Sequence, residues 1–126
     1  MNDNFLDKAK ENLKAAHLLF DNALYNATAN RAYYAAFQAA IAALVAEGHT
    51  LHTSHETVQS TFNGELIRRR KVYPSDLSSY LSDLQIVRNQ ADYSTKQISQ
   101  KVAARMLAKA ENFVTTVARR LVNDEF

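Results

Sequence analysis

The chain has 126 residues, 47% of them hydrophobic, and a net charge of +2 at pH 7. This length suits one domain, and the hydrophobic share is too high for a disordered protein. Only 2 glycines and 1 proline are present, too few for the tight turns of a sheet protein. We therefore expect an all-α protein in which residues 1–126 form a single domain.

The composition also limits which cellular compartment and which kinds of ligand are expected. The chain has no cysteine, which excludes disulfide bonds and thiolate metal sites. Its pI near 8.9 is mildly basic, short of the strong positive charge of dedicated nucleic-acid binders. The N-terminus is acidic and polar, unlike a signal peptide, and no apolar run approaches the roughly 20 residues of a membrane helix. We expect a cytoplasmic protein that has no membrane partner.

The first two predicted helices cover residues 5–24 and 26–47. In the first, one apolar seam recurs at steps of three and four, as in a helix packed along one side. The second carries two apolar stripes, one bulky (Tyr34, Phe37, Ile41, Leu44) and one mostly small (Tyr33, Ala36, Ala40, Ala43). Two stripes indicate contact on two sides, so this helix should be central or shared with a second subunit. Gly48 suits a C-terminal cap.

Three histidines follow at steps of three, at positions 49, 52 and 55. No acidic residue or cysteine shares this spacing, so ordinary loop polarity explains them better than a metal site does. The residues from Thr53 to Glu56 match a capping box and predict the start of a short helix that carries Val58 and Phe62. We expect no metal and no other cofactor.

A dense basic run, Arg68, Arg69, Arg70 and Lys71, comes next. Four adjacent cations cannot share one face of a helix, so they should fan out into solvent. The structural explanation is a solvated loop. The functional alternative is contact with phosphate groups, which would add salt-sensitive affinity without sequence preference.

The fourth predicted helix ends near Tyr93 and carries the most informative residue. Leu77, Leu81 and Leu84 mark one stripe, and Arg88 lies in line with them. A guanidinium group is costly to bury alone, so Arg88 must meet a carboxylate, a dipole, a partner subunit or an anionic ligand. A structural salt bridge and a ligand-binding groove both fit this position.

A further capping-box match, Ser94 to Gln97, predicts the start of the last helix, whose apolar stripe runs from Ile98 to Leu121. Four long amphipathic helices and one short one predict an antiparallel, up-down four-helix bundle with an additional short helix.

Several of these segments, in this order, resemble the HEPN family (higher eukaryotes and prokaryotes nucleotide-binding). They are Asn30–Phe37, then Gly48 and His55, then Arg88–Tyr93, and finally Ala110–Val114. The resemblance implies an all-helical bundle that usually dimerises. Small members are often encoded beside a minimal nucleotidyltransferase (MNT), and many such pairs act as toxin and antitoxin.

Active family members are metal-independent endoribonucleases whose motif joins an arginine and a polar residue to a histidine four to six positions further on. Arg88 and Asn89 match its start, but positions 93–95 hold tyrosine, serine and threonine. Gln38 also replaces a frequent family histidine. Tyrosine, with a pKa near 10, is a poor base at neutral pH, and pairing with Arg88 would make Asp92 a weak one.

The resemblance therefore implies the binding groove more strongly than the chemistry. We expect a dimeric HEPN/MNT component that binds RNA, a nucleotide or the nucleotidyltransferase around Arg88. The alternatives are an active endoribonuclease toxin using Arg88 with Asp92 or Tyr93, and a structural helical adaptor. The candidate catalytic residues are Arg88, Asn89, Asp92 and Tyr93, and the candidate RNA or nucleotide contacts are Arg31, Tyr34, Arg68, Arg69, Arg70 and Lys71.

Overall fold

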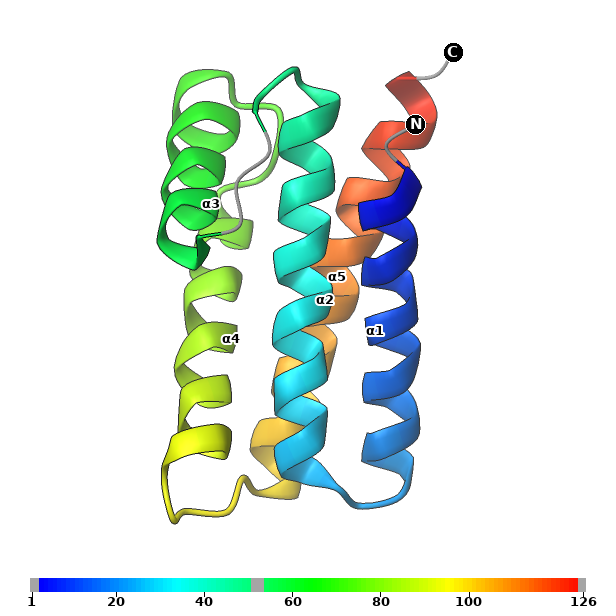
Figure 1. Cartoon of the computed structure of the whole chain (residues 1–126), viewed down its shortest axis with the longest axis vertical. Helices are drawn as coiled ribbons and strands as arrows, with labels where there is room; N and C mark the ends of the chain where they lie inside the picture. The colour runs from blue at the N-terminus through cyan, green and yellow to red at the C-terminus, as the bar shows by residue number, and fades with distance from the viewer. Residues whose placement is uncertain (1–2, 51–53, 125–126) are drawn as a thin grey trace.

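Four long helices form the body of the protein in a computed structural model that describes residues 3–50 and 54–124. They are α1 (Asp3–Asp21), α2 (Tyr25–Ala46), α4 (Asp76–Tyr93) and α5 (Gln100–Asp124), and they run alternately down and up (Figure 1). A shorter rod, α3 (His55–Thr61) continued by the π-helix η1 (Phe62–Arg69), packs against α2. The described residues contain no strand. The predicted antiparallel bundle with an additional short helix is confirmed.

Helix α2 is the central element. It contacts α1, α3, η1, α4 and α5, and Figure 1 shows it between α1 and α4, with α5 behind. Its buried side is built largely from alanines that have no exposed surface: Ala32, Ala35, Ala36, Ala39, Ala40, Ala42 and Ala43. Small side chains let neighbouring helices approach closely. The central position expected from the two apolar stripes is confirmed.

The C-terminal end of α2 closes as expected at Gly48. The amide of His49 donates to the carbonyl of Leu44 and that of Gly48 donates to Val45, both at 3.0 Å. Gly48 has φ +90°, a conformation that side chains with a Cβ rarely adopt. These two hydrogen bonds give partners to carbonyl groups that would otherwise lack a hydrogen-bond donor at the helix end.

A buried carboxylate ties this end of α2 to two other elements. Glu47, whose side chain is 7% exposed, lies 2.6 Å from Nη1 of Arg70 and 3.0 Å from Nη2 of Arg120. The wide turn of η1, in which the amide of Arg70 donates to Glu65 at 3.0 Å, ends at this arginine. Arg70, although it belongs to the exposed basic run, therefore has a structural partner.

Two helix starts differ from the capping boxes in the sequence. Ser54 caps α3, its Oγ accepting from the amide of Thr57 at 3.3 Å, while Thr53 lies outside the described residues. The prediction that α5 starts at Ser94 is wrong: α5 begins at Gln100, and Ser99 Oγ accepts from the amide of Val102 at 3.1 Å.

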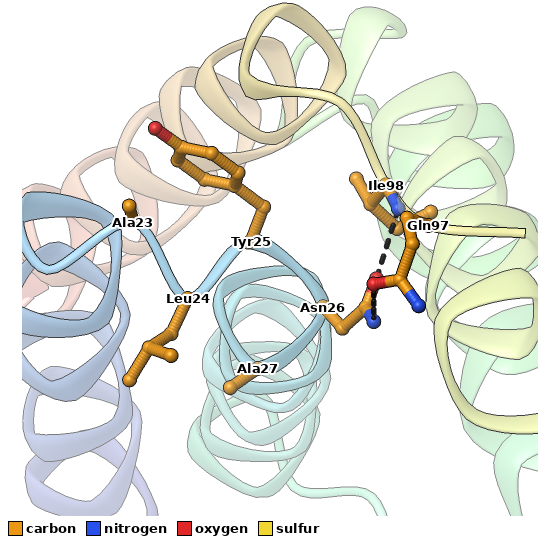
Figure 2. A pocket seen from close by; sticks show the side chains of 7 residues that line it. All are labelled: Ala23, Leu24, Tyr25, Asn26, Ala27, Gln97 and Ile98. Atoms are coloured by element: carbon orange, nitrogen blue, oxygen red, sulfur yellow. Dashed lines mark hydrogen bonds between the residues drawn. The ribbon is translucent and has the colours of Figure 1, made fainter.

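The cause of the later start is a contact with α2. Asn26 accepts from the amide of Ile98 at 2.9 Å and donates to the side chain of Gln97 at 2.8 Å (Figure 2). These bonds hold the connection against the first turn of α2, so the chain cannot enter its last helix before it has passed Ile98. Within the described residues, no helix is long and apolar enough to span a lipid bilayer.

Candidate functional site

Arg88 lies where the apolar stripe of α4 meets α2. Leu77, Leu81 and Leu84 of that stripe are buried, and the Arg88 side chain is only 14% exposed. Its Nε lies 3.0 Å from Oδ2 of Asp92, one turn further along α4. This Nε–H is not aligned for a hydrogen bond, so the contact is an ion pair. The sequence predicted that Arg88 needs a partner, and in the structure one partner is the carboxylate of Asp92.

The outer edge of the same guanidinium has neutral partners. Nη2 donates to the hydroxyl of Tyr34 at 2.8 Å, and Nη1 donates to Oδ1 of Asn89 at 3.1 Å. The Arg88 Cζ also lies 5.3 Å from the centre of the Tyr34 ring and 5.6 Å from those of Tyr33 and Tyr93. Each such cation–π contact contributes about 0.5–1 kcal/mol at an exposed site. Together they hold the guanidinium in one position.

A second guanidinium borders the Tyr34 ring. The Cζ of Arg31 lies 5.1 Å from the ring centre. Its Nε and Nη2 donate to Oδ1 of Asn30 at 2.8 and 2.6 Å. Asn30 in turn donates to Asp92 at 3.0 Å, so one carboxylate is linked to both arginines. We refer to Arg31, Tyr34, Arg88 and Asp92, with the linking Asn30, as the two-arginine site.

The two-arginine site combines an excess of positive charge with an accessible aromatic ring. Two guanidinium groups against one carboxylate leave a formal charge of +1. A polar strip continues from it to α1, because Arg31 donates to Asn12 at 3.1 Å and Asn12 donates to Gln38 at 2.8 Å. Guanidinium groups are planar, permanently charged donors whose geometry matches two oxygens of one phosphate. The site is therefore suited to an anionic ligand.

An imidazole lies on the inner side of this site. Nδ1 of His55 is 2.8 Å from the hydroxyl of Tyr33, and the His55 ring is centred 4.3 Å from Phe37 and 5.9 Å from Tyr34. Burial, followed by the charge of Arg88, lowers the pKa of His55. Burial raises the pKa of Tyr33 to about 12, opposed by Gln59 and Arg88. At neutral pH both groups are uncharged.

The sequence predicted loop polarity and a helix start around His55, and α3 does begin there, but the contact of His55 with Tyr33 and Tyr34 was missed. No periodicity links His55 to Tyr33 and Tyr34, because a loop separates the two helices that carry them. The available signal was its position after Gly48 in the family order. His52 lies outside the described residues, and elsewhere no group of three or more His, Asp or Glu side chains could hold a metal ion.

The predicted site residues fall into two groups. Those that the structure brings together are Arg31, Tyr34, Arg88, Asn89, Asp92 and Tyr93. The basic run lies elsewhere: α4 starts shortly after it, and Arg88 is twelve residues further along, about 18 Å at 1.5 Å per residue. Arg69 pairs with Glu65 at 2.7 Å, while Arg68 and Lys71 line a shallow hollow with Tyr73.

A separate hollow of about 370 Å³ lies at the end of the bundle, where Asn26 meets Gln97 and Ile98 (Figure 2). Its walls carry no charged side chain. It therefore offers no cation to an anionic ligand, whereas the two-arginine site offers two guanidinium groups.

Comparison with known proteins settles the family. A HEPN domain model matches residues 3–121. The chain belongs to the HEPN family. This HEPN chain is 31% identical over 111 residues to "UPF0332 protein glr0978" of Gloeobacter violaceus, a match that covers 86% of each chain. It is 29% identical over 119 residues to "Putative toxin MJ0605" of Methanocaldococcus jannaschii, covering 92% of this chain and 85% of the relative.

A solved structure supports the same fold. The crystal structure of TT1696 from Thermus thermophilus superposes with a TM-score of 0.77, covering 94% of this chain and 96% of the other. The sequence identity is 18%, so this likeness concerns the fold alone.

Proposed function

We propose that this HEPN protein binds RNA through its phosphate backbone at the two-arginine site and acts as the toxin-type component of a HEPN/MNT pair. One observation carries the proposal: Arg31 and Arg88 both lie on the ring of Tyr34, and the carboxylate of Asp92 contacts Arg88 directly and Arg31 through Asn30. Two guanidinium groups in this arrangement match phosphate oxygens. Tyr93, which is 77% exposed, adds a ring on which an unpaired base can stack.

The toxin-type role and the partners extend the proposal. The relative from M. jannaschii carries the word toxin in its name and matches 92% of this chain. The resemblance also implies a homodimer and a minimal nucleotidyltransferase partner. Ile86 and Tyr93, exposed by 55% and 77%, lie seven residues apart on one face of α4, and the Tyr93 ring centre lies 5.6 Å from the Cζ of Arg88. A second chain packed there would cover apolar surface and adjoin the site.

The ribonuclease alternative that relies on Asp92 or Tyr93 has less support. Asp92 is engaged by Arg88 at 3.0 Å and by Asn30 at 3.0 Å, so its charge is already compensated. The Tyr93 ring centre lies 5.6 Å from the Cζ of Arg88, and a phenol is a poor base at neutral pH. The structural-adaptor alternative treats Arg88 as a purely structural ion pair, and the following experiment separates it from RNA binding.

The test measures the anisotropy of a fluorescent single-stranded RNA oligonucleotide titrated with protein in EDTA at several salt concentrations. Arg88→Ala should weaken binding roughly tenfold and reduce the slope of log K against log salt by about one, because one phosphate contact is lost. Arg31→Ala should behave similarly. Arg119→Ala is the matched control, since it removes an exposed charge from the far end of α5 and should leave the affinity nearly unchanged.

Circular dichroism of the same samples completes the comparison. The proposal requires Arg88→Ala to keep the helical signal and the cooperative melting of the wild type. Equal losses of affinity in Arg88→Ala and Arg119→Ala would reduce the effect to net charge and contradict a specific site. An Arg88→Ala protein that simply unfolds would favour the adaptor, in which case Arg31→Ala decides whether the site binds RNA.

A further inference from the structure

Two amide side chains, Asn12 of α1 and Gln38 of α2, make up the polar strip that adjoins the two-arginine site. We infer that this strip reads a base of the bound RNA and favours guanine over adenine. The inference rests on the proposed RNA binding. It extends that binding from the phosphate backbone, which carries no sequence information, to the choice of RNA sequence.

The position of the polar strip follows from the periodicity of α2. Arg31, Tyr34 and Gln38 are spaced three and four residues apart, so they share one side of the helix, and each is partly exposed. Helix α1 lies beside α2, and Asn12 contacts both Arg31 and Gln38 (Figure 1). Gln38 lies seven residues beyond Arg31, about 10 Å along the helix at 1.5 Å per residue. The strip is therefore near enough to contact a base whose phosphate lies on Arg31.

Arg31 fixes the orientation of both amides. An arginine side chain has only N–H donors, so the atom of Asn12 that lies 3.1 Å from Nη1 of Arg31 must be its oxygen. The NH2 group of Asn12 then faces Gln38 and donates to its Oε1 at 2.8 Å. The NH2 group of Gln38 is left at the far end of this chain of hydrogen bonds. Turning either amide over would place N–H donors opposite each other and lose a hydrogen bond.

The polar strip therefore offers N–H donors to a ligand. Both amide oxygens already accept a hydrogen bond, whereas each NH2 group has two N–H donors. Asn12 uses one of its donors on Gln38, and no residue in the described part of the chain accepts from Nε2 of Gln38. Because the two amides are hydrogen-bonded to each other, their NH2 groups are neighbours.

This set of donors distinguishes the two purines. Guanine presents two adjacent acceptors, O6 and N7, whereas adenine presents N7 beside an amino group, which is a donor. Two neighbouring N–H groups can bond to both acceptors of guanine, but one of them would oppose the amino group of adenine. Unpaired RNA bases expose these edges, so the contact requires single-stranded RNA.

The experiment measures the anisotropy of short fluorescent oligouridines that carry guanine, adenine, inosine or 7-deazaguanine at alternate positions, titrated with the full chain. Guanine should bind about fivefold to tenfold more tightly than adenine. Inosine keeps O6 and N7 and should match guanine. 7-Deazaguanine lacks the N7 acceptor and should bind several-fold more weakly than guanine.

A change from donor to acceptor tests the polar strip directly. Gln38→Glu keeps an oxygen for Asn12 but replaces the NH2 group by a second oxygen, so the preference for guanine over adenine should disappear or reverse. The added charge weakens both oligonucleotides alike, and the ratio of their affinities removes this effect. Gln85→Glu is the matched control. Gln85 also accepts from a second amide, Gln59 at 2.6 Å, but it lies between α3 and α4, so its ratio should equal that of the wild type.

The failures are distinguishable from each other. Equal affinities for guanine and adenine, with binding that still depends on Arg88, overturn the inference and leave the proposed function standing. A guanine preference that survives Gln38→Glu, or that only Gln85→Glu removes, overturns the inference as well. RNA binding that ignores Arg88 contradicts the proposed function itself. Should Gln38→Glu fail to fold, Asn12→Ala replaces it, and an unchanged guanine preference in that variant overturns the inference.

Discussion

Arg88 has partners of two kinds, and the difference between them decides what the residue can do. Its Nε edge faces the carboxylate of Asp92, whereas its Nη1 and Nη2 face the uncharged oxygens of Asn89 and Tyr34. A phosphate oxygen can replace a neutral acceptor with a net gain, since charge-assisted hydrogen bonds are roughly twice as strong. The structural ion pair and the ligand site are therefore compatible: Asp92 aims the guanidinium, and its outer edge remains exchangeable.

His55 should make folding stability depend on pH. Its folded pKa lies below the ordinary value of 6.5, so the unfolded chain binds this proton more readily than the folded chain does. Stability is therefore retained above about pH 6.5 and falls as the pH drops from there through the lowered folded pKa. In thermal melts from pH 7.5 to 4.5, the Tm of the wild type should decline more steeply than that of His55→Gln. Parallel declines would contradict the lowered pKa.

Periodicity within each segment was enough to predict the helices, but not their ends or their cross-links. The seams on α1, α4 and α5 recur at steps of three and four, and the structure buries them. Ser94 matched a local cap signal, yet Asn26 of α2 holds the following connection and moves the cap to Ser99. Contacts of this kind join residues far apart in sequence, and no local pattern encodes them.

The same limit applies to the candidate site. Arg88 could be singled out because an arginine interrupts a leucine stripe, and Arg31 and Tyr34 because they share a segment that resembles the HEPN pattern. The contact of His55 with Tyr33 joins residues of two different helices, α3 and α2, and the periodicity within one helix does not specify such a contact. The run of four adjacent cations in the sequence likewise gave no sign that Arg70 forms an ion pair with Glu47.

The start of α5 offers a direct test of the observed cap. Ser99→Ala removes the side-chain acceptor for the Val102 amide, so it should lower the free energy of unfolding by about 0.5–2 kcal/mol. Ser94→Ala is the matched control: Ser94 accepts only from the amide of Lys96 in the connection and should cost less. Urea denaturation of both variants gives the comparison. A larger loss for Ser94→Ala would place the helix start at the sequence-predicted capping box.

At the scale of the whole molecule, the exposed apolar side chains on α4 favour assembly. Ile86 and Tyr93 share a face of α4, and Tyr93 also contacts Arg88, so a partner bound to this face would reach the edge of the two-arginine site at Tyr93. Leu18 on α1 is exposed to a similar extent, 56% against 55% for Ile86, but belongs to another helix. The same substitution can therefore be made at Ile86, inside the proposed dimer face, and at Leu18, outside it.

Ile86→Glu should convert the proposed dimer to a monomer, because a carboxylate would have to be buried in the interface. Leu18→Glu adds the same charge and should leave the dimer intact. Sedimentation velocity over a range of protein concentrations measures both variants and the wild type. A wild-type protein that stays monomeric, or a dimer that only Leu18→Glu disrupts, would move the interface away from α4.

The alanine side of α2 has a consequence for how this protein can diversify. Seven of its alanines have no exposed surface, so a larger side chain at any of them must push a neighbouring helix outward. The side chains of the polar strip, Asn12 and Gln38, are only partly buried, and that of Asn89 beside Arg88 is exposed, so they can change in size with less effect on the core. New ligand preferences can therefore arise by substitution along that strip, while the helix that carries Arg31 and Tyr34 keeps the same backbone.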